Sequence, residues 1–393
     1  MKKLIVLFCL IVTARSYSQD FENCVDSLYS QSFLTRLFAV ECINDLKIYS
    51  ALDALGELLE NQPPYLQVQF LNALYTLEDP KIRTRAHELI ERADGFGEDP
   101  EHPYNPLEAK VFATTILVYI GDFSTVNYAF EKLNQDEITT DDALAFHLLP
   151  YIMDQIPSYK DEAKNILLGL LNNDDEYFRY YALLYLAEEF GKEMNSELVN
   201  KLVNDNDLPT RFLALEYLFK QKYAGLNSLL KTQLIQDRTG VFRTAIADSL
   251  LQKFGEPSDL KAVISYQPNE PEETARSLMG YSIDEFIPPK PDTLNWQGTI
   301  TKLLSYTNEI LEYGWIKNEE TRDYYIQKLS YINEALENNN STAEACTIIN
   351  DKLLPKAEQD LNRELITTEG YKFLHYYTIY IKEEIEKEYG ACH

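Results

Sequence analysis

The sequence predicts an all-α protein, with an array of stacked helical hairpins over the first two thirds of the chain and a small four-helix bundle at its end. Arginines recur every 32 residues between residues 174 and 254, and apolar residues there are spaced by three and four. The 14 Gly and 16 Pro among 393 residues are too few for a fold of many tight β-turns. Apolar residues at 45 % allow a large core, so the chain is not a disordered acidic tail.

The clearest repeat is centred on three arginines, Arg179, Arg211 and Arg243. An acidic residue stands four positions before the first two of them, at Asp175 and Asp207, and the third copy departs from this pattern. After each Arg, apolar residues mark one face of a helix, and a shorter apolar segment follows. Because a period of 20 to 50 residues is typical of stacked arrays, each copy is predicted to be one helical hairpin.

A further copy is expected at residues 79–83, where Asp79 and Arg83 have the same spacing and lie three periods before Asp175 and Arg179. An acidic residue at a helix start caps free amides and complements the helix dipole. The Arg four residues on can reach that carboxylate or one in a neighbouring turn, which would form a ladder between stacked units. We interpret six residues as structural repeat positions of this kind: Arg83, Asp175, Arg179, Asp207, Arg211 and Arg243.

The short pattern Asp-x-x-x-Arg-x-x-Ala resembles HEAT-like repeats of the shorter kind. The resemblance covers roughly residues 30–264, with good matches at 174–254 and 79–93. It implies a right-handed α-solenoid of HEAT-like helical hairpins, whose extended surface binds a protein or a peptide. Tetratricopeptide and ankyrin repeats have similar periods, but their landmark residues are missing from this chain.

The composition changes at residues 265–293, where five prolines interrupt helical continuity. This range is predicted to be a linker or strap between an array at 19–264 and a bundle at 294–393. In the last hundred residues helical periodicity resumes in four segments, at about 295–314, 319–338, 342–361 and 367–389.

The last domain carries a second resemblance. The residues Leu311-x-x-Gly314-Trp315-Ile316, followed by Lys328-Leu329 and Ala335-Leu336, resemble FIMAH domains, which are small helical modules appended to secreted bacterial hydrolases. The resemblance implies a module that is not itself catalytic.

Residues 1–18 have the pattern of a secretory signal peptide. Lys2 and Lys3 precede an apolar run at 4–12, and Ser16 and Ser18 supply the small residues of a cleavage site. Nine apolar residues are too short to cross a bilayer core of about 30 Å. No later segment approaches 18 consecutive apolar residues. We therefore expect an exported protein, periplasmic or secreted, whose mature chain does not span a membrane.

The charge limits the class of partner. The chain has 36 basic and 63 acidic residues, a formal charge of -27 and a pI near 4.6. Loss of the leader removes three basic residues and no acidic one, which leaves a charge of -30. Such a surface repels phosphates, so nucleic acid is excluded as a partner. It favours a protein or peptide with basic patches.

Four cysteines remain beyond the predicted leader, and four cysteines allow three pairings. Proximity along the chain favours disulfides between Cys24 and Cys42 and between Cys346 and Cys392, and an oxidising compartment would support them. There is no Cys-x-x-Cys, and the five His are scattered singly, so no metal site is expected.

The sequence contains no Gly-x-Ser-x-Gly, phosphate-binding glycine loop, His-Glu-x-x-His or dinucleotide fingerprint, so we expect neither an enzyme nor a cofactor. Tyr177, Tyr180, Tyr181 and Tyr185 cluster in one repeat, where they either fill space between helices or line a partner surface. The preferred function is an exported, non-enzymatic scaffold that binds a protein or peptide on the solenoid surface. The alternative is an all-helical carbohydrate-active enzyme or a glycan-binding protein.

Overall fold

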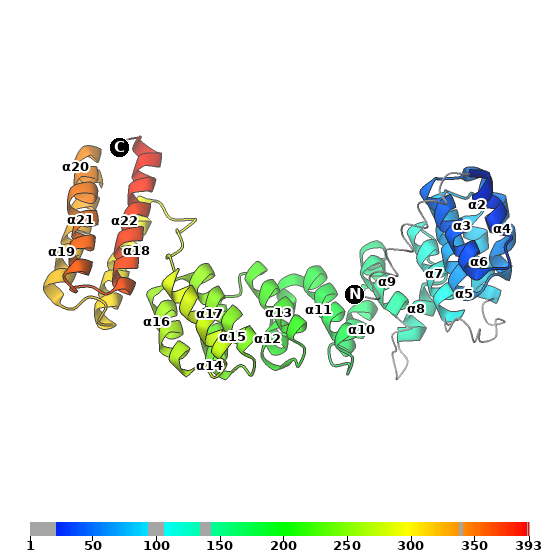
Figure 1. Cartoon of the computed structure of the whole chain (residues 1–393), viewed down its shortest axis with the longest axis horizontal. Helices are drawn as coiled ribbons and strands as arrows, with labels where there is room; N and C mark the ends of the chain where they lie inside the picture. The colour runs from blue at the N-terminus through cyan, green and yellow to red at the C-terminus, as the bar shows by residue number, and fades with distance from the viewer. Residues whose placement is uncertain (1–20, 93–105, 134–142, 338–340, 391, 393) are drawn as a thin grey trace. The chain divides into compact units, whose positions relative to one another are not determined.

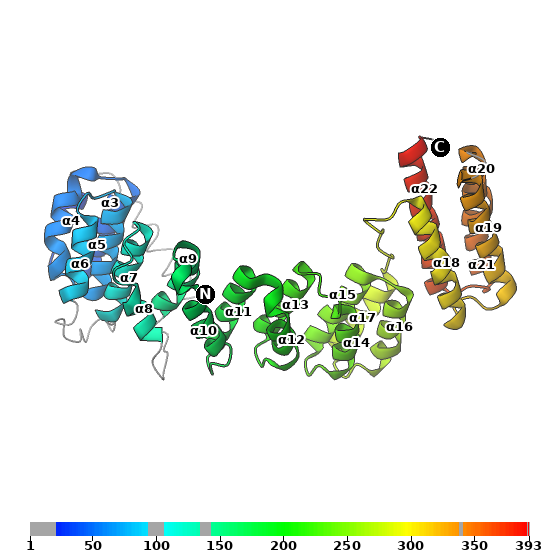
Figure 2. The same cartoon turned by 180° about the vertical axis from the view of Figure 1, so that it is seen from behind.

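The computed structural model describes residues 21–92, 106–133, 143–337, 341–390 and 392. Within these residues the fold is all-α, and the only β-type pairing is an isolated antiparallel bridge between Ile316 and Ile366. The predicted leader, residues 1–18, lies outside the described residues. The chain forms two compact units, one ending at Phe190 and the other beginning at Gly191. Within the first unit the helices follow one another in chain order (Figures 1 and 2).

The helices of the first unit pack in two layers. Helices α3, α5, α7 and α9 pack successively on one another, and the intervening helices α6 and α8 each pack on the next member of that layer. The helices of this unit are α2 (Phe21–Ser27), α3 (Phe33–Asp45), α4 (Leu52–Leu58), α5 (Pro64–Thr76), α6 (Ile82–Arg92), α7 (Pro106–Tyr119), α8 (Val126–Leu133), α9 (Ala143–Gln155), α10 (Lys160–Leu170) and α11 (Glu176–Phe190).

The second unit begins with the same alternation. Helix α12 packs on α13, α14 packs on α15, and α15 packs directly on α17. The helices of this part are α12 (Asn195–Asn204), α13 (Leu208–Lys220), α14 (Leu226–Gln236), α15 (Gly240–Ser249), α16 (Pro257–Tyr266) and α17 (Glu273–Asp284). Phe242 in α15 is fully buried, with its ring 5.0 Å from that of Phe212 in α13, so aromatic packing joins successive helices.

Buried arginines connect successive helices of the second unit. Arg211 on α13 is 1 % exposed, forms an ion pair with Asp237 in the loop before α15, and donates to Thr239 Oγ1 at 3.0 Å. Arg243 on α15 repeats the contact one step on, donating to both carboxylate oxygens of Glu270 at 2.7 and 2.5 Å. The Arg243 hydrogen bond holds the pKa of Glu270 below its usual value. A ladder of buried ion pairs therefore crosses each of these joints.

The acidic partners in this ladder differ from those that the sequence indicated. Asp207 does not pair with Arg211: its carboxylate caps α13 by accepting from the backbone N–H of Thr210 at 2.9 Å. Asp175 likewise accepts from a backbone N–H, that of Tyr177, at 2.9 Å. The carboxylates that pair with the arginines, Asp237 and Glu270, lie two positions before the N-cap residues of α15 and α17, where the loop before each helix turns.

A single turn recurs in these loops. In each loop the residue six positions before the Arg accepts a hydrogen bond, through its side chain, from the backbone N–H two residues later. In most copies its backbone carbonyl also accepts a hydrogen bond from the Arg side chain. Arg243 donates to the Asp237 carbonyl at 2.6 Å, and Arg179 donates to the Asn173 carbonyl at 2.9 Å. The residues in this loop position are Ser30, Asp79, Asn173, Asp205, Asp237 and Glu270.

The prediction for Arg83 is wrong. This residue lies on α6, outside the layer formed by α3, α5, α7 and α9, and its side chain is 59 % exposed, 3.4 Å from Asp122. The counterpart of Arg211 in that layer is Arg36 on α3, which donates to the Ser30 carbonyl at 2.9 Å and follows an N-cap serine, Ser32, by four residues.

Within the range 265–293 that was predicted as linker or strap, the structure contains the end of α16 and all of α17. Arg276 on α17 donates to the Glu270 carbonyl at 2.8 Å, which repeats the loop contact of the preceding helices. The segment after α17 then runs along Gly255, whose φ of +62° and whose approach to Pro289 leave no room for a side chain.

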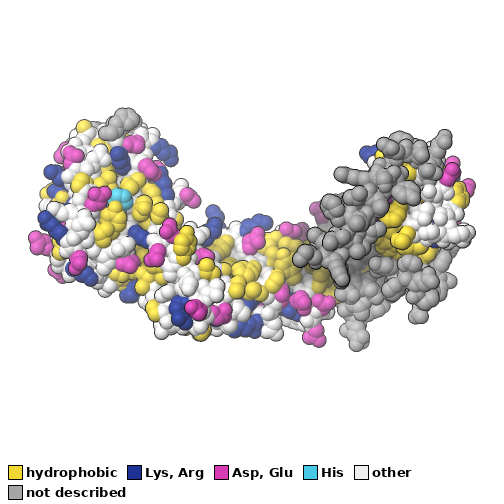
Figure 3. Space-filling view, viewed as in Figure 1, with side chains coloured by type: hydrophobic (Ala, Val, Ile, Leu, Met, Phe, Trp, Pro, Cys, Tyr) yellow, Lys and Arg dark blue, Asp and Glu magenta, His cyan; other side chains and the backbone are white. Residues whose placement is uncertain are grey.

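The last hundred residues form a helical bundle. Its helices are α18 (Trp296–Glu312), α19 (Glu319–Glu337), α20 (Thr342–Thr347), α21 (Leu354–Asn362) and α22 (Thr368–Tyr389), and a π-helical stretch, Ile348–Leu353, joins α20 to α21. Pro355 lies two residues after the end of that stretch; since proline lacks an N–H, the regular i to i−4 bonding cannot continue through it. On the visible face of the bundle, acidic, basic and hydrophobic side chains are interspersed (Figure 3).

Two disulfides close loops within the two units. Cys24 is joined to Cys42, which connects α2 to α3, and Cys346 on α20 is joined to Cys392 beyond α22. These are the pairings that proximity along the chain favoured. The bundle is also tied to the preceding segment, because Lys372 on α22 donates to the carbonyls of Ile283 and Asp284 at 2.9 and 2.6 Å.

Replacing Arg211 by Met should destabilise the protein by about 3 to 5 kcal/mol, because the carboxylate of Asp237 would remain buried without its partner. The matched control is Arg83→Met, which the sequence pattern would treat as equivalent but which should change stability by less than about 0.5 kcal/mol at its exposed position. Urea unfolding followed by circular dichroism measures both. Equal losses in the two variants would contradict the assignment of the ladder.

Removing the disulfides should lower the free energy of unfolding in proportion to the loops they close. With sequence separations of 18 and 46, loop entropy gives about 3 kcal/mol for the Cys24–Cys42 pair and about 4 kcal/mol for the Cys346–Cys392 pair. Double Cys→Ser variants produced in an oxidising host test this in urea. Peptide mapping of the unreduced wild-type chain provides the independent check, and a different pairing would show the assignment to be incorrect.

Candidate functional site

Helix α11 presents the predicted tyrosine cluster. Tyr177, Tyr181 and Tyr185 are spaced by four residues, so they lie on one face of the helix, and all three are half-buried. Tyr180 is also half-buried, and its ring meets the edge of Tyr181 at 5.2 Å. The tyrosines are thus neither core residues nor isolated surface residues, because each keeps part of its ring accessible.

The structure adds a histidine that the sequence did not single out as part of this cluster. His147 on α9 places Nδ1 against the hydroxyl of Tyr185 and Nε2 against the hydroxyl of Tyr177, and its ring meets Tyr181 edge-on at 5.1 Å. A neutral imidazole has one N–H donor and one acceptor nitrogen. One tyrosine therefore donates to His147 while the other accepts from it.

Burial favours the uncharged forms of these side chains. It lowers the pKa of His147, and it raises the pKa values of Tyr177 and Tyr185, with neighbouring phenols acting in the same direction. Neutral phenols and a neutral imidazole retain their hydrogen-bonding capacity without the desolvation cost of a charge. The hydrogen bonds to His147 orient the rings of Tyr177 and Tyr185.

Three more tyrosines extend the cluster over neighbouring helices. Tyr119 at the end of α7 stacks near Tyr75 of α5 at 6.4 Å and meets Tyr151 of α9 edge-on at 4.5 Å. Tyr151 stands four residues after His147, so the two lie on the same side of α9. Tyr75 and Tyr119 are 36 % and 47 % exposed. We call the whole set the tyrosine face: Tyr75, Tyr119, His147, Tyr151, Tyr177, Tyr181 and Tyr185.

Sequence reasoning missed the part of this face outside α11. Tyr119 and Tyr151 are separated by 32 residues, which is the repeat period, and this spacing was the available signal. Tyr75 stands 44 residues before Tyr119, so no fixed period relates it to the others.

Carboxylates surround the tyrosine face. Asp154 raises the pKa of Tyr151, Asp175 raises that of Tyr177 and Glu188 raises that of Tyr185, in each case as a minor contribution beside burial. Within the described part of the chain, no Lys or Arg lies over any of these rings, although such contacts occur elsewhere, as between Lys261 and Tyr313. The accessible ring surfaces are therefore open to a cation from another molecule.

Other kinds of site find little support in the described residues. No cluster of three or more His, Cys, Asp or Glu side chains there has an arrangement suited to a metal ion. The described helices also include none with the length and apolar character needed to traverse a bilayer.

No family model matches the chain, and a search of curated proteins finds no match.

The neutral state of His147 predicts a pH dependence. Because its pKa in the folded state lies below the ordinary value of 6.5, the unfolded chain binds the proton more readily, and the contribution of His147 to stability is present above pH 6.5 and lost as the pH falls below it. His147→Gln keeps a donor and an acceptor but does not titrate. Between pH 8 and pH 5 the wild type should therefore lose more stability in urea than this variant, and parallel curves would contradict the expectation.

Proposed function

We propose that this protein is an exported, non-enzymatic scaffold that binds a protein or peptide partner on its solenoid surface, and specifically on the tyrosine face. The observation that carries the proposal is the set of partly exposed, mutually packed tyrosines on α5, α7, α9 and α11, with carboxylates beside them. The proposal assigns no catalytic residue and no cofactor.

Tyrosine suits such a role for physical reasons. It presents a large apolar ring with a hydrogen-bonding tip, and it loses little conformational entropy on binding. The hydrogen bonds through His147 already fix Tyr177 and Tyr185, so less ordering remains to be done when a partner binds.

The charge indicates the chemistry of the partner. Asp154, Asp175 and Glu188 lie beside rings that no Lys or Arg of the described chain covers. Lysine or arginine side chains of a partner could stack on the rings while pairing with the carboxylates. A net charge of -27 would also accelerate encounter with a basic partner.

The finer architecture is part of the proposal. We assign the array to a right-handed α-solenoid of HEAT-like hairpins and the last hundred residues to a four-helix module similar to FIMAH domains. The direct packing of α3 on α5, α5 on α7 and α15 on α17 supports the first assignment, as does the arginine ladder. The helical segments from α18 to α22 support the second.

Export to the periplasm or beyond the cell is supported by the two disulfides, since such bonds persist in oxidising compartments. The apolar run near the start of the sequence is the other support.

The alternative is a carbohydrate-active enzyme or a glycan-binding protein. The chain has many acidic residues, as such an enzyme would need. However, sugar sites rely on exposed aromatic rings, and both tryptophans of this chain lie in the bundle. Trp296 is 3 % exposed and Trp315 stacks against Phe373. The tyrosine face itself is the surface through which a glycan could bind, so a glycan array probed with the same chain separates the two functions.

The binding test uses peptides selected from a random display library on the full chain. Selected peptides should be enriched in Lys and Arg, and changing Tyr75, Tyr119 and Tyr151 together to Ala should weaken their binding at least about tenfold, because exposed tyrosines often dominate an interface. Fluorescence anisotropy with one labelled peptide measures the effect.

The matched control changes three exposed tyrosines outside the tyrosine face, Tyr281, Tyr331 and Tyr389, to Ala. These lie in the second unit, so peptide affinity should remain as in the wild type. Equal loss in both triple variants, or selection of peptides without basic residues, would count against the tyrosine face as the binding surface.

A further inference from the structure

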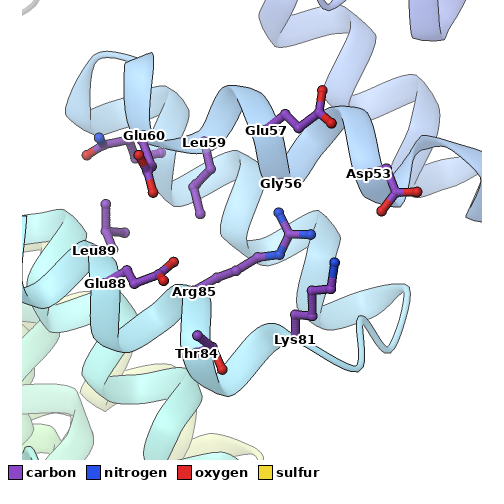
Figure 4. Close-up of a pocket in the computed structure, with 11 residues that line it drawn as sticks. Asp53, Gly56, Glu57, Leu59, Glu60, Lys81, Thr84, Arg85, Glu88 and Leu89 are labelled. Carbon is purple, nitrogen blue, oxygen red and sulfur yellow. The ribbon is translucent and has the colours of Figure 1, made fainter.

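A pocket of about 280 Å³ lies between α4 and α6 in the first unit, with α5 beneath it. Its floor includes Leu59, Gln67 and Leu89, which are buried, and its rim consists of charged residues of α4, of α6 and of the segments beside these two helices. In Figure 4 the side chains of Arg85 on α6 and of Lys81, just before α6, extend toward α4.

The floor contains an amide that the protein does not satisfy. Gln67 on α5 is 0 % exposed, and neither its Nε2 nor its Oε1 has a hydrogen-bond partner among the described residues. A buried amide without partners is costly, and such groups are rare in folded proteins. Gln67 belongs to the pocket lining but is covered, so rotation of its side chain would let a ligand there both donate to it and accept from it.

One wall of the pocket holds a guanidinium group with free bonding capacity. The Arg85 Nε lies 2.8 Å from Asp79 Oδ2, which anchors the side chain, while its terminal nitrogens have no hydrogen-bond partner within the described residues. The group rests directly on Gly56 of α4: a Cβ added there would lie 1.0 Å from Arg85 Nη1. Any side chain at position 56 would therefore displace the guanidinium.

The remaining charges of the lining are mixed and mostly negative. Asp53, Glu57, Glu60 and Glu88 contribute four carboxylates, while Lys81 and Arg85 contribute two cations. A simple anion would meet net repulsion, and a simple cation would leave the terminal nitrogens of Arg85 without an acceptor. A ligand that carries one carboxylate and more than one ammonium group matches both parts of the lining.

We propose that this pocket binds a free α-amino acid with a basic side chain, its carboxylate on Arg85, its polar groups on Gln67 and its ammonium groups toward the carboxylates of α4 and α6. The volume fits a molecule of this size rather than a folded segment of another protein. This site is separate from the tyrosine face, because none of its lining residues belongs to that set.

The test is isothermal titration calorimetry of the full chain with L-lysine at low ionic strength. Three analogues each remove one group: L-lysinamide lacks the carboxylate, Nα-acetyl-L-lysine lacks the α-ammonium, and L-norleucine lacks the side-chain amine. L-Lysine should bind, and each analogue should bind at least tenfold more weakly. Absence of binding by L-lysine, or equal binding of L-lysinamide, would overturn the proposal.

Two variants then locate the site. Gln67→Leu should weaken L-lysine binding at least tenfold while leaving the melting temperature unchanged or higher, because it replaces an unsatisfied buried amide with an apolar side chain. Gly56→Ala should also abolish binding, by displacing Arg85. The matched control is Gly169→Ala on α10, where nothing lies within 4 Å of the added Cβ, and it should bind as the wild type does.

The Gln67→Leu result decides the matter if Gly56→Ala fails to fold. Unchanged L-lysine affinity in Gln67→Leu would show that the amino acid binds elsewhere. Peptide binding by the tyrosine face should be the same in all of these variants, so failure of the pocket proposal is distinguishable from failure of the proposed function.

Discussion

The array depends on one constraint: a guanidinium group buried or half-buried at the start of a helix must find hydrogen-bond acceptors there. Arg211 and Arg243 meet it with a carboxylate from the next repeat, and Arg36 and Arg179 donate to the carbonyls of their own preceding loops. Because an unpaired buried charge is strongly unfavourable, each such contact fixes where the loop lies relative to the helix. Helix spacing, and with it the surface that successive helices present, follows from these contacts.

Much of this fold could be predicted from sequence, because helical periodicity and capping are local. Asp207 was recognisable as a helix start, and the four helical segments of the last hundred residues agree with the structure within a few residues. The ladder partners Asp237 and Glu270 were not recognisable, since equivalent positions hold different residue types. Arg83 shows the opposite error. The local sequence pattern is present there, but it lies on α6, outside the layer that contains α3 and α5.

The candidate site was predictable only where it lies on one helix. Tyr177, Tyr181 and Tyr185 share a face of α11 by spacing alone, whereas the contribution of His147 depends on how α9 packs against α11. The pocket is still harder to predict from sequence. Arg85 of α6 lies against Gly56 of α4, and α5 separates these two helices along the chain. Contacts between helices whose repeats differ in length leave no periodic pattern in the sequence.

The ladder has a mechanical consequence. In an array whose members contact only their neighbours, a pulling force acts on the joints in series, so the weakest joint opens first. The joint between α15 and α17 is held by a bidentate bond between Arg243 and Glu270, shielded from water, and such a bond must break before the helices separate. Under tension this part of the chain should extend last, as a stiff segment.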